Sequence, residues 1–121
     1  MAVIDLSIYR KDDLEIKSLK GNIYTIPGNF STEFYINLYD KYQKIQSKKK
    51  KDEAKEYMQI AKDLALDILK LDKSKNVTME TIENEFDDLN VLIALISEIM
   101  TYANDINNDP LQVSPTLKSN Q

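Results

Sequence analysis

Two segments with apolar residues at helical spacing constrain the fold of this 121-residue chain more than any other feature. In residues 52–71 and again in residues 89–103, apolar side chains recur every three or four positions. They occupy about half of the helical wheel in the first segment and more than half in the second, whereas a helix on the surface of a small domain needs a narrower stripe. We therefore expect both helices to be buried on two sides or to contact another protein.

Two further helices are predicted from their capping residues. Ser31 is a suitable N-cap for a helix over 32–46, and Phe30 is placed to pack against Tyr35 at its start. Thr78 is the expected N-cap of a short helix over 79–86, and Asp87 or Asp88 then begins the helix over 89–103.

The residues before these helices predict a β-hairpin over 14–26. Two short apolar runs surround the Gly21-Asn22 pair, a common turn sequence. The apolar phase slips between Ile16 and Leu19, which indicates a bulge near Lys17 or Ser18. The first six residues are a possible third strand.

These elements define an α+β fold that is mainly α: an N-terminal β-hairpin followed by three to four helices. We expect one domain over 1–104. Residues 105–121 lack both periodicity and apolar density, which predicts a flexible C-terminal tail.

The composition excludes most routes to catalysis. The chain has no cysteine, no histidine and only two glycines, so it offers no thiol nucleophile, imidazole base, Cys/His zinc site or glycine-rich phosphate loop. The acidic run over 80–88 is explained by helix N-termini and caps. Residues 72–83 match the spacing of a calcium-binding loop, but Val77 stands where that loop needs glycine. We expect no enzyme activity, no cofactor and no metal.

Charge and hydropathy restrict the partners. The net charge of −4 opposes nucleic-acid binding, which normally needs a clustered positive field. The longest unbroken apolar run is too short to cross a membrane. We expect a cytoplasmic protein with no nucleic-acid or membrane partner.

The surplus apolar surface leaves protein binding as the main candidate activity, and six residues at the edges of two apolar arcs are candidate contacts. The last helix contributes Val91, Leu95 and Tyr102, and the helix over 32–46 contributes Tyr35, Tyr39 and Tyr42. The alternative is structural. The last helix is then packed on both sides, and the tyrosine rings cover the margin of the core with their hydroxyls in water.

Taken in order, the elements resemble those of a known family. They are a small β element ending in residues 23–28 (IYTIPG), a helix opening at 31–34 (STEF), residues 76–80 (NVTME) before a short acidic helix, and residues 87–89 (DDL) before a very apolar helix. This arrangement, over roughly residues 10–104, is similar to the tail assembly chaperones of long-tailed, siphovirus-type phages and prophages of Gram-positive bacteria.

The resemblance implies a non-enzymatic phage morphogenesis protein that works in the bacterial host cytoplasm. Such a chaperone binds the tape measure protein, helps the tail tube protein polymerise around it, and commonly self-associates. Two alternatives stay open: a structural phage or prophage protein such as a head-tail connector, and an unrelated helical adaptor.

Overall fold

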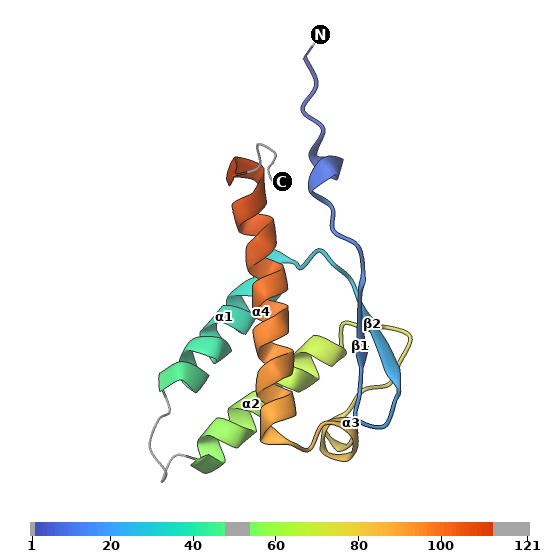
Figure 1. Ribbon diagram of the computed structural model, residues 1–121, viewed down its shortest axis with the longest axis vertical. Helices are drawn as coiled ribbons and strands as arrows, with labels where there is room; N and C mark the ends of the chain where they lie inside the picture. The colour runs from blue at the N-terminus through green and yellow to red at the C-terminus, as the bar shows by residue number, and fades with distance from the viewer. Residues whose placement is uncertain (1, 48–53, 113–121) are drawn as a thin grey trace.

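The computed structural model describes residues 2–47 and 54–112, with side chains as far as Asn104. A two-stranded antiparallel hairpin is followed by four helices, which confirms the predicted mainly α fold class (Figure 1). The elements, in chain order, are a 3-10 helix η1 (Leu6–Tyr9), β1 (Leu14–Lys17), β2 (Ile23–Ile26), α1 (Thr32–Ser47), α2 (Ala54–Leu69), α3 (Met79–Glu85) and α4 (Leu89–Gln112).

The hairpin forms as predicted but without the expected bulge. Leu14 and Ile16 of β1 lie opposite Ile26 and Tyr24 of β2, so these four apolar side chains share the face toward the helices. β1 ends at Lys17, and the exposed Leu19 belongs to the turn. The apolar phase therefore slips because the strand has ended.

The turn of the hairpin depends on a glycine. The N–H of Gly21 donates a hydrogen bond to the Ser18 carbonyl at 2.9 Å, and Gly21 has a φ of 88°. That backbone conformation is accessible to glycine at little cost. The possible third strand does not form among the described N-terminal residues: residues 2–5 have no regular secondary structure, and residues 6–9 form η1.

Local capping sets the starts of the helices. The Ser31 hydroxyl accepts a hydrogen bond from the Phe34 N–H at 3.1 Å, and the Asp88 carboxylate accepts one from the Val91 N–H at 3.1 Å. Both caps were predicted, and Asp88 is the acidic residue that begins α4. At the start of α1, Phe30 forms an aromatic pair with Phe34, whose ring centroid lies 5.1 Å away.

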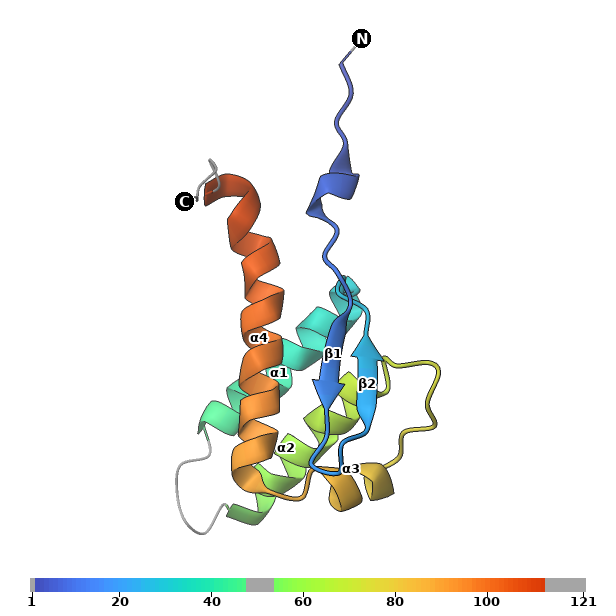
Figure 2. The same cartoon turned by 45° about the vertical axis from the view of Figure 1, so that its right-hand side comes forward.

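The core is built around α2, which explains its wide apolar arc. This helix packs against α1, α3, α4 and β2, so it is buried on more than one side (Figures 1 and 2). Its fully buried residues are Ala61, Leu64, Ala65, Ile68 and Leu69. Opposite them lie the buried residues of α4, which are Leu92, Leu95, Ile96, Ile99, Met100 and Ala103. Burial on more than one side, one of the two expectations for this helix, thus explains the wide apolar arc of α2.

α4 is longer than predicted. We expected it to end near Ala103, but its backbone continues to Gln112 and includes the first part of the predicted flexible tail. Once a helix exists, each added residue gains a hydrogen bond without a new nucleation step, so the helix extends beyond its buried part. The rest of the tail, 113–121, lies outside the described residues.

An apolar arm precedes the hairpin. Residues 2–9 project away from the body of the molecule, beyond the first residue of β1 (Figures 1 and 2). Val3, Ile4, Leu6 and Ile8 are each at least 67% exposed, and η1 buries no residue.

Candidate protein-interaction groove

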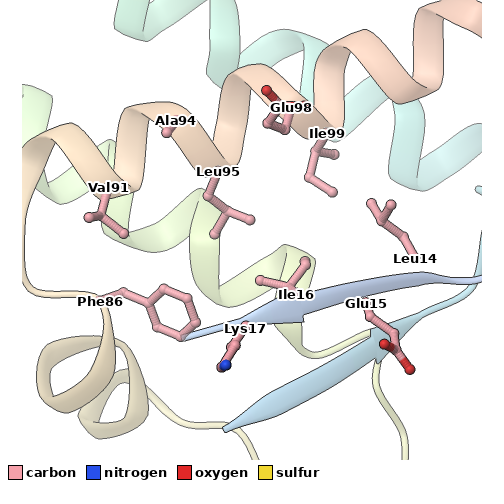
Figure 3. Close-up of a pocket in the computed structure, with 10 residues that line it drawn as sticks. All are labelled: Leu14, Glu15, Ile16, Lys17, Phe86, Val91, Ala94, Leu95, Glu98 and Ile99. Carbon is pink, nitrogen blue, oxygen red and sulfur yellow. The ribbon is translucent and has the colours of Figure 1, made fainter. Parts of the chain in front are cut away.

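An apolar groove runs between β1 and α4 (Figure 3). Its volume is about 340 Å³. The side chains that line it are Leu14, Glu15, Ile16 and Lys17 from β1, Phe86 from the end of α3, and Val91, Ala94, Leu95, Glu98 and Ile99 from α4. Seven of these ten residues are apolar, and the three charged residues are Glu15, Lys17 and Glu98. The groove therefore suits an apolar segment that carries charges at its margin.

Local sequence explains how the two walls form. The Phe86 carbonyl accepts a hydrogen bond from the Asp88 N–H at 2.8 Å in the tight connection between α3 and α4. Asp88 then caps α4, so Val91 and Leu95, one helical turn apart, lie on the side that borders β1. Period-two alternation brings Leu14 and Ile16 of β1 to the opposite wall.

The two edges of the hairpin differ. The outer edge of β2 is engaged, because the Thr25 N–H donates to the Asp72 carboxylate at 2.8 Å. No described backbone group pairs with the outer edge of β1, which borders the groove. Such an edge presents N–H and C=O groups to an added strand.

The structure brings together two of the three candidate residues on the last helix. Val91 is half-buried and Leu95 is 8% exposed, and both line the groove. Tyr102 has a different place. Its hydroxyl donates to the Asp12 carbonyl at 2.5 Å, and the Lys11 ammonium lies 4.3 Å from the centre of its ring. Tyr102 thus fastens the segment before β1 to α4.

The three candidate tyrosines of α1 line no part of this groove. Tyr35 stacks on Tyr39 with ring centroids 6.4 Å apart, and its hydroxyl bonds with the Asn104 amide oxygen at 3.2 Å. Tyr42 is half-buried against the core, whereas Tyr39 is 46% exposed. Tyr35 and Tyr42 therefore cover the margin of the core, as the structural alternative expected.

Sequence reasoning missed several residues of the groove. Leu14 and Ile16 were assigned only to the hairpin, Phe86 only to the end of a helix, and Ala94 to no role. The alternation at 14–17 and the position of Ala94 one turn from Val91 and Glu98 were visible signals. Neither signal predicts which helix packs beside which strand edge, so neither could identify the groove.

The Glu85 carboxylate near the hairpin forms a hydrogen bond with a tyrosine of β2. The Tyr24 hydroxyl donates to Glu85 at 2.8 Å. Burial, with the hydrogen bond to Glu85 and the negative charge there, raises the pKa of Tyr24 to about 12. Burial acts to raise the pKa of Glu85, but hydrogen bonds from Asn22, Tyr24 and Ser18 outweigh it and hold that pKa below its usual value.

Asp72 closes the loop between α2 and α3. Its carboxylate accepts hydrogen bonds from the Ser74 hydroxyl at 2.6 Å, the Ser74 N–H at 2.9 Å and the Thr25 N–H at 2.8 Å. The Ser74 hydroxyl bond, followed by the Thr25 N–H, lowers the pKa of Asp72. This carboxylate therefore connects the loop to β2.

Comparisons with known proteins leave the family open. No family model, curated protein or solved structure matches this chain. None of the helices in the described residues has both the length and the apolar character required to cross a membrane.

Proposed function

We propose that this protein is a phage tail assembly chaperone that binds the tape measure protein and assists tail tube morphogenesis. The observation that carries the proposal is the apolar groove between β1 and α4, which contains Val91 and Leu95. The order of elements, which resembles that family from the hairpin to the last helix, supports it as well.

The proposed mechanism is recognition of an amphipathic client helix. The apolar side chains of one helical face enter the groove beside Leu95 and Ile99, and Glu98 borders a polar flank of the client. The net charge of −4 keeps the complexes apart in solution.

Co-expression with the tape measure protein encoded nearby tests the proposal. The groove variant is Ala94→Arg, because Ala94 is exposed and lines the groove, so a longer charged side chain blocks the groove without disturbing the core. The matched control is Ser97→Arg, an exposed position of the same helix that does not line the groove.

We expect wild type and the Ser97→Arg control to increase the soluble fraction of the tape measure protein, and Ala94→Arg to lose most of that effect. The chaperone function is wrong if wild type leaves the client as insoluble as it is alone. Recovery of this chain from purified virions would instead favour a structural role such as a head-tail connector.

A further inference from the structure

The N-terminal arm has the pattern of a half-buried strand although no strand forms there in this structure. Ile4, Leu6 and Ile8 alternate with Asp5 and Ser7. All three apolar residues are exposed, and η1 is held by hydrogen bonds from Ser7 to the Asp5 carboxylate. A single exposed 3-10 turn opens at little cost. The arm is therefore an apolar segment that the described part of its own chain leaves uncovered.

The segment after the arm is fixed, and this directs the arm away from its own groove. The Lys11 N–H donates to the Asn29 amide oxygen at 3.2 Å, and the Tyr102 hydroxyl donates to the Asp12 carbonyl. Gly28 lies so close to this segment that a Cβ there would be 2.1 Å from the Asp12 oxygen. Folding the arm back along β1 of the same chain would break these contacts.

We propose that, in the absence of a client, the groove between β1 and α4 receives the N-terminal arm of a second copy of this chain, which adds a strand to the open edge of β1, so that the arm and the client exclude each other. The arm supplies the apolar residues, and the groove supplies an apolar floor and unpaired backbone groups. This inference concerns the chain alone and does not rest on the chaperone function.

The charges of the arm and of β1 favour an added strand that runs antiparallel to β1. With Asp5 of the arm opposite Lys17 of the second copy, Arg10 of the arm falls opposite Asp12, so two pairs of opposite charges form. A parallel arm that places Leu6 beside Ile16 brings Asp5 beside Glu15 instead.

The same antiparallel register places the apolar residues correctly. Leu6 then lies opposite Ile16 and Ile8 lies opposite Leu14, so both arm residues share the face of β1 that is turned toward α4. Ser7 lies opposite Glu15 on the outer face. The arm leads directly into β1, so a two-fold axis near Lys11 relates the two copies. Each copy then places its arm beside β1 of the other, as in an isologous dimer.

Solution mass measures the association. We expect the full chain at high micromolar concentration to have about twice the chain mass of 14.0 kDa by light scattering. The arm variant Leu6→Asp/Ile8→Asp and the groove variant Ala94→Arg each fall to the monomer mass. The control Leu19→Asp, which changes an apolar residue of the hairpin turn that is 60% exposed, keeps the dimer mass. Circular dichroism checks that each variant is folded.

Disulfide trapping tests the register, and the absence of native cysteine makes it specific. A Ser7→Cys chain mixed with a Glu15→Cys chain is expected to give a mixed disulfide dimer under mild oxidation, because opposed residues in this pairing are close enough for the bond. A Thr25→Cys chain, with its thiol on β2, is the matched control and is expected to cross-link to Ser7→Cys at least fivefold less.

A wild-type chain that stays monomeric at high concentration would overturn the inference, as would a dimer that survives the arm substitutions. Equal cross-linking of Ser7→Cys to the Glu15→Cys and Thr25→Cys chains would also overturn it. None of these measurements contains a phage client, so they are independent of the co-expression result.

Discussion

The Tyr102 hydroxyl donates a hydrogen bond to the Asp12 carbonyl, and this joins α4 to the segment that precedes β1 across 90 positions of sequence. The Lys11 ammonium lies against the same ring and also donates to the Tyr102 carbonyl. The position of the arm therefore depends on α4 as much as on the hairpin.

Tyr102→Phe is expected to loosen this attachment without changing the helix. It removes one hydrogen bond and keeps the ring beneath Lys11, so we expect a loss of roughly 0.5–1.5 kcal/mol in the free energy of unfolding. Amide hydrogen exchange should speed up at Lys11, whose N–H donates to Asn29. Tyr39→Phe is the control because Tyr39 is 46% exposed. Equal exchange in Tyr102→Phe and wild type would contradict the structural role.

Tyr24→Phe should change the dependence of stability on alkaline pH. The pKa of Tyr24 is about 12 in the folded chain and about 10 in the unfolded one. Between these values the folded chain keeps a proton that the unfolded chain loses, so the stabilisation by the hydroxyl is complete below pH 10 and declines as the pH rises toward 12.

Urea denaturation of both proteins from pH 8 to pH 11 measures this effect, since the lysine titrations are common to the two chains. At pH 8 we expect wild type to be more stable than Tyr24→Phe by roughly 1–2 kcal/mol, because a bond to the Glu85 carboxylate is lost. The difference should shrink above pH 10. A difference that stays constant to pH 11 would show that the hydroxyl titrates alike in both states.

The sequence predicts the features of this fold that depend on neighbouring residues. The caps at Ser31 and Asp88 and the inward alternation of Leu14 and Ile16 all formed, because each is decided within a few positions. The bulge was wrong for a related reason: alternation stops where a strand stops, and the sequence around Leu19 does not mark that point.

Reasoning from neighbouring residues could not predict which helix packs beside which strand. The apolar arc of α4 identifies Val91, Leu95 and Tyr102 as equivalent edge residues, but the structure separates them. Which of them borders a groove depends on how α4 crosses the hairpin, and residues on β1 and α4 are more than 70 positions apart. The periodicity of a helix predicts how wide its apolar face is, but it does not predict which element packs against that face.

The two glycines offer a matched pair of substitutions. In Gly28→Ala the new Cβ would lie 2.1 Å from the Asp12 oxygen and 2.7 Å from the Lys11 oxygen, so backbone must move. We expect a loss of about 1–3 kcal/mol, typical of overpacking. Gly21→Ala has open space around it but a φ of 88°, so we expect a loss of about 1 kcal/mol from strain alone.

Thermal melting and hydrogen exchange distinguish the two glycine variants. Gly28→Ala should also speed up exchange at Lys11, because the Asn29 bond moves with the displaced turn. Gly21→Ala should leave Lys11 protected. If Gly28→Ala melts at the wild-type temperature, the close contact between this turn and Asp12 is not part of the folded structure in solution.

Asp72→Ala is expected to destabilise the protein in a manner that depends on acidic pH. The pKa of Asp72 is lowered in the folded chain, first by the Ser74 hydroxyl and then by the Thr25 N–H. The Asp72 carboxylate therefore stabilises the folded chain fully at pH values above its unfolded pKa, near 3.8. This stabilisation is lost as the pH falls through the lower pKa of the folded chain. At neutral pH we expect a loss of about 1–3 kcal/mol, because the part-buried donors of Thr25 and Ser74 lose a charged acceptor.

Chemical denaturation at pH 7 and at several values below pH 4 measures this change, with the exposed Asp40→Ala as the control. The gap between wild type and Asp72→Ala should narrow as acid protonates the Asp72 carboxylate, whereas Asp40→Ala should stay within about 0.5 kcal/mol of wild type at neutral pH. Since Asp72 also occupies the outer edge of β2 through Thr25, Asp72→Ala exposes a second strand edge. A rise in aggregation of this variant alone is the expected consequence, and a gap that is unchanged in acid would mean that the carboxylate does not connect the loop to β2.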